Sequence, residues 1–151
     1  MIFDIVSEPV DGTYRQLLAQ CRKYSSTAIL VLRDPDDLSP VASGLLNRIQ
    51  PWCISKDKRS EWPGTIMRNF LATVYTYRLD PALVTELQTV ATGLYQWIQP
   101  ELPEDPCLLR PDGTPLLVTI AHERDAYLIV SQQEVDSLLS TVPGLALHRR
   151  E

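Results

Sequence analysis

The sequence predicts an α+β fold in two layers, with a mixed sheet, about four helices and a C-terminal three-stranded antiparallel meander. Short apolar runs alternate with amphipathic segments in the order β-α-β-α-β-α-β-β-β-α, and only tight turn signals separate the last strands. No internal repeat, low-complexity tract or linker interrupts the chain. We therefore expect residues 1–151 to form a single domain.

The first half of the chain is expected to alternate strands and helices. Ile2–Val6 is a short apolar run, and the following "DGTYRQLLAQCRKY" places apolar residues at helical spacing. Thr27–Leu32 is apolar on both faces and too short for a helix, which is typical of a central strand covered on both sides. Ser39 and Pro40 are suited to the N-cap and first position of a second helix, which should end before Pro51.

A long connection and a third pair of strand and helix follow. Residues 50–64 show no clear period, and irregular connections of that length are often functional or mobile. Phe70–Leu79 is rich in β-branched and aromatic residues, which predicts a strand. Asp80–Pro81 then opens a helix whose apolar stripe runs to Ile98, and Pro100 should end it.

The last third of the chain predicts an acidic connector, the meander and a fourth helix. The connector is the proline-rich segment Pro100–Pro106. Pro111–Gly113 is a turn that pairs its flanking apolar runs as a hairpin, and a second turn at "HERD" leads to the strand Ala126–Val130. Ser131 and Glu134 have the spacing of a capping box, so the fourth helix should begin there. The closing "LALHRR" adds a short edge strand or a tail.

The composition is ordinary for a globular protein, with 44% hydrophobic and 22% charged residues. No apolar run approaches the roughly 20 residues that span a bilayer, and the first residues lack the basic region of a secretory signal. Cys21, Cys53 and Cys107 are odd in number, and no pair has metal-ligand spacing. We therefore expect reduced thiols, a cytoplasmic location, no membrane partner and no cofactor.

The net charge of −5 is unevenly distributed along the chain. Residues 1–80 carry ten Lys and Arg against nine Asp and Glu, whereas residues 81–151 carry four against ten. An acidic protein is repelled by phosphate backbones, so nucleic acid is disfavoured as a ligand. A basic protein partner would be attracted, because complementary charge accelerates encounter.

The stretch "TIAHERDAYLIV" contains the residues best suited to catalysis. In an active site, His122 would be a general base oriented by Glu123 or Asp125. Adjacent strand residues point to opposite faces, however, so His122 and Glu123 share a pocket only if the turn brings them together. Charged side chains at a hairpin tip remain solvated, which favours a hairpin tip over an active site.

A second candidate is the acidic segment after the predicted central strand. Asp34, Asp36 and Asp37 lie where magnesium-dependent phosphoryl enzymes place metal ligands. The chain has no glycine-rich phosphate loop to accompany them, nor a G-x-S-x-G, H-E-x-x-H or C-x-x-C motif. The alternative interpretation is a turn that starts the second helix, whose N-terminus favours acidic side chains.

Two further segments are candidate partner-binding surfaces. Trp52 and Trp62 flank a basic loop and are of a residue type enriched at binding hot spots, although large aromatic residues also anchor loops to a core. Glu101, Glu104 and Asp105 alternate with prolines that would limit the entropy lost on binding. The alternative for this acidic stretch is a solvated connector.

The leading hypothesis is a small, acidic, non-enzymatic bacterial protein that binds a basic partner in the cytoplasm. In size, charge and missing catalytic motifs, the chain resembles in type the immunity proteins that block the active site of a toxin; no residue is carried over from them. The expected contact residues lie mainly in the acidic second half of the chain. They are Glu101, Glu104, Asp105, Glu123 and Asp125, with Trp52 and Trp62 as anchors.

The alternative hypothesis is a small hydrolase-type enzyme. It would use His122 with Glu123 or Asp125, or a metal ion held by the carboxylates between Asp34 and Asp37. A third interpretation is a structural subunit that buries apolar surface in a homo-oligomer. No motif in the sequence names a family, so these classes can be separated only by the tertiary structure and by experiment.

Overall fold

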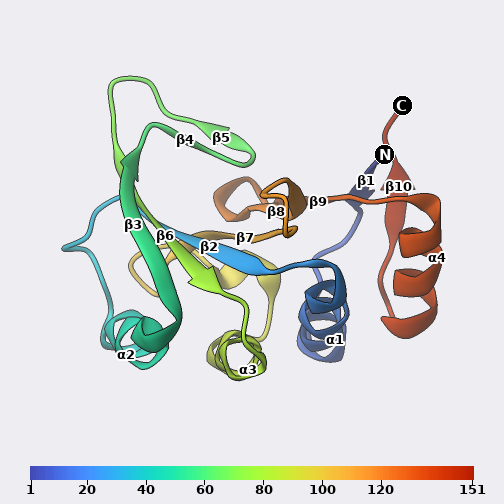
Figure 1. Ribbon diagram of the computed structural model, residues 1–151, viewed down its shortest axis with the longest axis horizontal. Helices are drawn as coiled ribbons and strands as arrows, with labels where there is room; N and C mark the ends of the chain where they lie inside the picture. The colour runs from blue at the N-terminus through green and yellow to red at the C-terminus, as the bar shows by residue number, and fades with distance from the viewer.

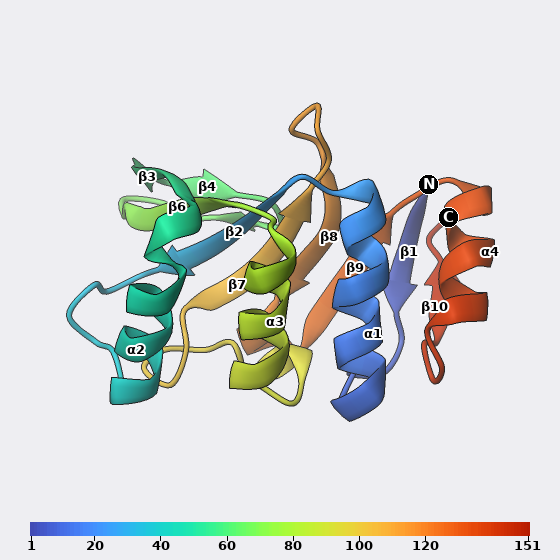
Figure 2. The ribbon, with the colours of Figure 1, turned by 60° about the horizontal axis from the view of Figure 1, so that its bottom comes forward.

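The computed structural model describes all residues from Met1 to Glu151 and has an α+β architecture. An eight-stranded sheet carries four α-helices on one face, and the helices lie side by side in the order α2, α3, α1, α4 (Figures 1 and 2). The helices are α1 (Asp11–Cys21), α2 (Pro40–Ile49), α3 (Pro81–Val90) and α4 (Gln132–Thr141). The predicted number of helices is therefore confirmed.

The strand order in the sheet is β10-β1-β9-β8-β7-β2-β6-β3. These strands are β1 (Ile2–Ile5), β2 (Thr27–Leu32), β3 (Cys53–Arg59), β6 (Ala72–Arg78), β7 (Glu104–Leu109), β8 (Pro115–Ile120), β9 (Asp125–Ile129) and β10 (Leu147–Arg149). A separate two-stranded hairpin, β4 (Glu61–Trp62) and β5 (Thr65–Ile66), lies on the face opposite the helices (Figure 1). The strands β7, β8 and β9 are consecutive neighbours, each antiparallel to the next.

The prediction of a mixed sheet is wrong, because every pair of neighbouring strands is antiparallel. The helices α1, α2 and α3 do connect strands that run in the same direction. In each case, however, other strands are inserted between the two: β6 separates β2 from β3, and β2 separates β6 from β7. A crossover sets the direction of the next strand, but it does not decide which strands become neighbours.

The main hydrophobic core fills the space between the helices and the sheet. Its largest fully buried side chains include Tyr14 and Trp97, whose polar atoms are paired: the Tyr14 hydroxyl donates to the carbonyl of Leu87, and the Trp97 indole donates to the Tyr14 hydroxyl. A second, smaller cluster lies on the opposite face of the central strands under Trp62. Strand β2 is thus buried on both faces, as its apolar sequence predicts.

Two segments differ from the sequence-based prediction. Residues 50–64 are not an irregular loop, because they form a 3₁₀ turn, the edge strand β3 and the first strand of the β4–β5 hairpin. The third helix ends at Val90, because the backbone is extended at Ala91 and Gly93 bridges to Val10. A Cβ atom on Gly93 would lie 2.7 Å from the Glu8 carboxylate, so a larger residue here would displace that side chain.

The chain termini meet at one edge of the sheet, where β1 pairs with both β9 and β10 (Figure 2). Phe3 is opposite Arg149, and Arg150 forms an ion pair with Asp4. The helices contain only ten or eleven residues each, and none of them has the length and apolar character needed to cross a bilayer.

Candidate functional site

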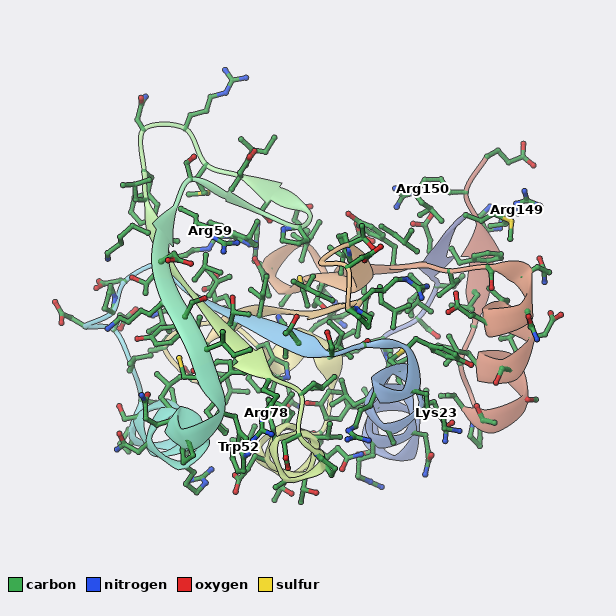
Figure 3. All side chains as sticks on the ribbon, in the orientation of Figure 1. Lys23, Trp52, Arg59, Arg78, Arg149 and Arg150 are labelled. Atoms are coloured by element: carbon green, nitrogen blue, oxygen red, sulfur yellow. The ribbon has the colours of Figure 1, made fainter.

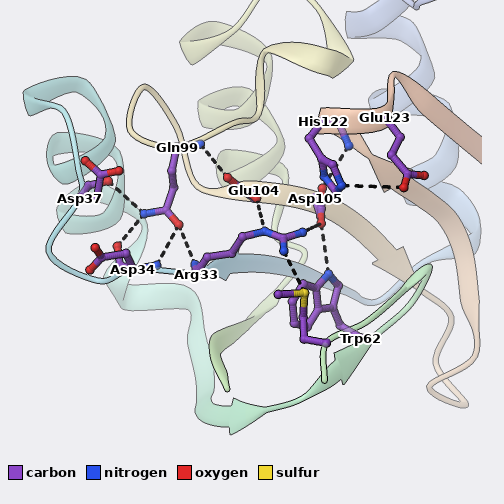
Figure 4. Close-up of polar contacts among 11 residues, drawn as sticks. Arg33, Asp34, Asp37, Trp62, Gln99, Glu104, Asp105, His122 and Glu123 are labelled. Atoms are coloured by element: carbon purple, nitrogen blue, oxygen red, sulfur yellow. Dashed lines mark hydrogen bonds and ion pairs between the residues drawn. The ribbon is translucent and has the colours of Figure 1, made fainter. Parts of the chain in front are cut away.

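A partly buried polar network lies where β2 ends and β7 begins, on the face that carries the β4–β5 hairpin (Figure 4). Arg33 follows β2 directly, and its Nε donates to the Glu104 carboxylate at 2.5 Å. Its Nη2 lies 3.5 Å from the Asp105 carboxylate, and its guanidinium stands 5.4 Å from the centre of the Trp62 ring. We call Arg33, Glu104, Asp105 and Trp62 the Arg33 network.

Asp105 is the most buried charged residue of this network, with no exposed surface. Its backbone is left-handed (φ 54°), at an irregularity in the pairing of β2 with β7. The carboxylate accepts hydrogen bonds from the Trp62 indole at 3.2 Å and from the backbone N–H of Ala121 at 3.0 Å. Burial nevertheless raises the pKa of Asp105 above its ordinary value, and these hydrogen bonds and Arg33 offset the rise only in part.

Gln99 connects the Arg33 network to the loop after β2. Its backbone N–H donates to the Glu104 carboxylate, and its side-chain oxygen accepts from the backbone N–H of Arg33 at 2.6 Å. Its side-chain nitrogen donates to the carbonyls of Asp34 and Asp37 at 2.6 and 2.9 Å. The side-chain amide of Gln99 thus fixes the backbone of the loop Asp34–Asp37, which we call the acidic loop (Figure 4).

His122 stands beside the Arg33 network in the 3₁₀ turn between β8 and β9 (Ala121–Glu123). A ligand atom from each of His122, Glu104 and Asp105 lies within 4.8 Å of the others, which is the only such group in the chain. The imidazole is 44% exposed and lies 3.9 Å from the Glu123 carboxylate. Arg33 already neutralises part of the carboxylate charge, so a divalent cation here would face a fixed positive charge.

The carboxylates of Asp34, Asp36 and Asp37 are exposed and do not gather into a set of metal ligands. One Asp34 oxygen instead accepts the backbone N–H of Asp36 within the turn. The acidic loop does lie next to another predicted residue, Glu101, because Ser39 donates its hydroxyl to the Glu101 carbonyl and its N–H to Pro100. We call Asp34, Asp36, Asp37 and Glu101 the acidic rim.

Glu101 of the acidic rim lines a surface groove with a volume of about 690 Å³, and the lining residue Gln99 holds the loop of the three rim aspartates. The groove is formed by the start of α2, the end of α3 and the segment that follows α3. Half of its lining residues are hydrophobic, and Glu101 is the only charged one. The lining residues are Ser39, Val41, Val90, Tyr95, Gln96, Ile98, Gln99, Pro100, Glu101 and Leu102.

The predicted contact residues fall into two groups. Glu104, Asp105 and Trp62 are buried in the Arg33 network, so their polar atoms face one another rather than solvent. The other predicted contact residues are accessible to solvent: Glu101 and Glu123 are exposed, and Asp125 and Trp52 are half-buried. The prediction that Pro100–Pro106 is a solvated connector is wrong from Leu102 onward, because Leu102 and Pro103 are buried and β7, which pairs with β2, begins at Glu104.

Sequence reasoning missed Arg33 and Gln99 as organising residues. The sequence indicates their roles only weakly: Arg33 directly follows an apolar strand, and Gln99 precedes a proline. The partner of Arg33 is 71 positions away along the chain, so no local pattern could have paired it with Glu104.

Comparisons with family models, curated protein sequences and solved structures found no match to this chain.

Proposed function

We propose that this chain is a small, acidic, cytoplasmic binding protein that takes a basic protein partner at the groove and its acidic rim. One observation carries the proposal. A groove of about 690 Å³ has the exposed Glu101 and no basic residue in its lining, and the loop that carries Asp34, Asp36 and Asp37 is hydrogen-bonded to the lining residue Gln99. A partner segment with an apolar side chain next to Lys or Arg would match both features.

The two parts of the site would contribute differently to binding. Burial of an apolar side chain in the groove supplies affinity, at about 25 cal/mol per Å² of apolar surface removed from water. The rim carboxylates attract cations, which raises the association rate and makes it depend on salt. The hydrogen bonds of Gln99 and Ser39 hold the rim in place, so little ordering is needed when a partner binds.

An inhibitor-type role is consistent with this chemistry. A basic partner such as a nuclease-like enzyme has a cationic surface that binds phosphate, and an acidic protein seated there would exclude the substrate. Glu123 and Asp125 belong to a second acidic segment in the turn after β8 and at the start of β9. Their contribution is tested separately from that of the rim.

The first test compares partner capture by charge-matched variants. The rim variant Asp36→Asn, Asp37→Asn, Glu101→Gln removes three exposed charges, and keeps Asp34 because its side chain supports the turn. The control Asp11→Asn, Glu61→Gln, Glu151→Gln makes the same charge change elsewhere on exposed residues. We expect a basic partner to be captured at low salt by the wild type and the control, and released at high salt.

Association with the rim variant should be slower by about tenfold or more at low salt, measured by surface plasmon resonance. An unchanged association rate for this variant would rule out the rim as the contact surface. A parallel variant, Glu123→Gln with Asp125→Asn, then shows whether the second acidic segment carries the interaction instead.

A hydrolase-type enzyme is the second candidate, favoured by the position of His122 next to two carboxylates. His122 would act as general base with Glu123 or Asp125, or a metal ion would bind at His122, Glu104 and Asp105. Thermal unfolding with Mg²⁺, Mn²⁺ or Zn²⁺ tests the metal form, because a ligand of the native state raises its stability. Hydrolase activity that survives His122→Ala would exclude the histidine form.

A further inference from the structure

Residues 60–71, which we call the arm, expose apolar side chains on the face opposite the helices. Ile66, Phe70 and Leu71 are 75%, 40% and 57% exposed. Large apolar side chains exposed together on one short segment commonly mark an interaction site. The arm contains the β4–β5 hairpin and the turn that leads into β6 (Figure 1).

The strand that leads into the arm is basic, and the arm itself carries one basic and one acidic residue, Arg68 and Glu61. Arg68 is exposed on the arm and forms no ion pair. Lys58 and Arg59 precede the arm at the end of β3, where Arg59 forms an ion pair with Asp57 (Arg59 is labelled in Figure 3). Residues 53–71 carry four Lys and Arg against two Asp and Glu, in a chain whose net charge is −5. The exposed apolar side chains are therefore accompanied by positive charge.

The arm is fastened to the sheet at several points. The Trp62 indole donates to Asp105, and the sulfur of Met67 accepts a hydrogen bond from Arg33 at 3.0 Å. Gly64 lies so close to β8 that a Cβ atom there would be 2.7 Å from Val118. Because the base of the arm is held in this way, Ile66, Phe70 and Leu71 are presented with little ordering left to lose on binding.

The chemistry of the arm complements that of the groove on the same chain. The groove offers apolar walls with an acidic rim, and the arm offers apolar side chains with Arg68. The two cannot meet within one molecule, because the arm lies on the face of the sheet opposite the helices whose ends form the groove (Figure 1). The arm is thus available only to the groove of another molecule.

We propose that the arm of one copy binds in the groove of a second copy, with Phe70 or Leu71 as the apolar anchor and Arg68 at the rim. The inference rests on the proposed function, because it names a second copy of this chain as one ligand of the groove. The contact uses two different surfaces, so it leaves a free arm and a free groove at the ends of each assembly. Self-association should therefore rise with protein concentration and fall with salt.

Sedimentation of the purified full chain tests this arrangement. The arm variant Phe70→Ser, Leu71→Ser changes two exposed side chains, and the groove variant Val41→Arg, Glu101→Arg changes two exposed residues that line the groove. Each variant alone should weaken self-association by about 100-fold. The control Val6→Ser, Leu139→Ser removes exposed apolar side chains elsewhere and should associate like the wild type.

The decisive measurement mixes the two variants. The arm variant keeps an intact groove and the groove variant keeps an intact arm, so the mixture should form a one-to-one dimer and nothing larger. Circular dichroism of each variant establishes that it is folded. A monomeric wild type, a groove variant that still associates, or a mixture that stays monomeric would each overturn the proposal.

The same variants separate this inference from the proposed function. If the wild type stays monomeric but the rim variant loses a basic partner, the proposed function holds and the self-association fails. If the mixture dimerises but no other partner depends on the rim, the groove binds this chain alone. If the wild type stays monomeric and the rim variant binds partners like the wild type, both proposals fail.

Discussion

At the scale of the residue, Arg33 compensates the negative charge of two buried carboxylates. Its guanidinium is the only cation that contacts Glu104 and Asp105, both of which are buried. Removing one partner of a buried ion pair leaves an uncompensated charge, whereas exposed pairs contribute little. The exposed pair of Arg48 with Glu86 provides a matched comparison on the same molecule.

We expect Arg33→Met to lower the free energy of unfolding by about 3–5 kcal/mol, measured by urea denaturation at neutral pH. The control Arg48→Met should cost no more than about 1 kcal/mol. Adding Glu104→Gln to Arg33→Met should recover part of the loss, because one of the unpaired charges is then gone. Equal losses from the two arginine variants would contradict the role assigned to Arg33.

Asp105 makes stability depend on pH in a direction opposite to that of most carboxylates. Burial raises its pKa in the folded state. Its contribution to stability is therefore fully present below the pKa of the unfolded chain and is lost as pH rises through the folded pKa. The stability of the wild type relative to Asp105→Asn should thus decrease as the pH rises above 3.8, the ordinary pKa of an aspartate, in denaturant titrations. A difference that stays constant over this range would show that the charge on Asp105 carries no such cost.

At the scale of the element, α4 depends on a glutamate with two roles. Glu134 accepts the backbone N–H of Ser131 in the capping box, and it binds Arg110 through both carboxylate oxygens at 2.9 and 2.7 Å. The Arg110 guanidinium lowers the pKa of Glu134 below its ordinary value. The helix is thereby connected to the turn that joins β7 and β8.

Glu134→Gln should destabilise the protein by about 1–2 kcal/mol at neutral pH, because it weakens both the cap and the charged pair. The pKa of Glu134 is lowered on folding, so this stabilisation is present above the unfolded pKa and lost as pH falls through the folded pKa. The wild type and the variant should therefore converge in acid when their thermal unfolding is compared. Asp136→Asn on the same helix is the control, and it should show a smaller effect.

At the scale of the whole molecule, the two ends of the chain pair with each other at one edge of the sheet. Arg150 donates its N–H to the carbonyl of Ile2, and β10 pairs with β1 along its length. The turn at Pro111–Gly113 is exposed and connects strands that are also held by their other neighbours. The fold should therefore tolerate a new pair of ends at this turn.

A circular permutant that joins Glu151 to Met1 by a short Gly/Ser linker and opens between Asp112 and Gly113 should fold. We expect its Tm to lie within about 5 °C of the wild type by circular dichroism. Opening instead between Leu117 and Val118, in the middle of buried β8, should prevent folding because it breaks a central strand. Failure of the first permutant would show that the β7–β8 turn is needed to form the sheet.

The sequence by itself determined the type and the starting points of several elements. Ser39, Asp80 and Ser131 cap three helices as predicted, because each side chain bonds to a backbone N–H only two or three residues away. The apolar run Thr27–Leu32 likewise predicted a strand buried on both faces. Capping and periodicity act within a few residues, so they can be read without knowing the rest of the fold.

Only the tertiary structure decided which strands are neighbours and which charges are buried. Local patterns correctly placed a crossover after β2, but they could not show that β6 would pair beside it and make the sheet antiparallel. The same holds for the candidate sites: Glu104 is buried because it meets Arg33, and Glu101 joins the loop of Asp34 and Asp37 through bonds made by Ser39 and Gln99. These contacts span 62 to 71 positions of the chain, and their free energy arises only when packing brings the partners together.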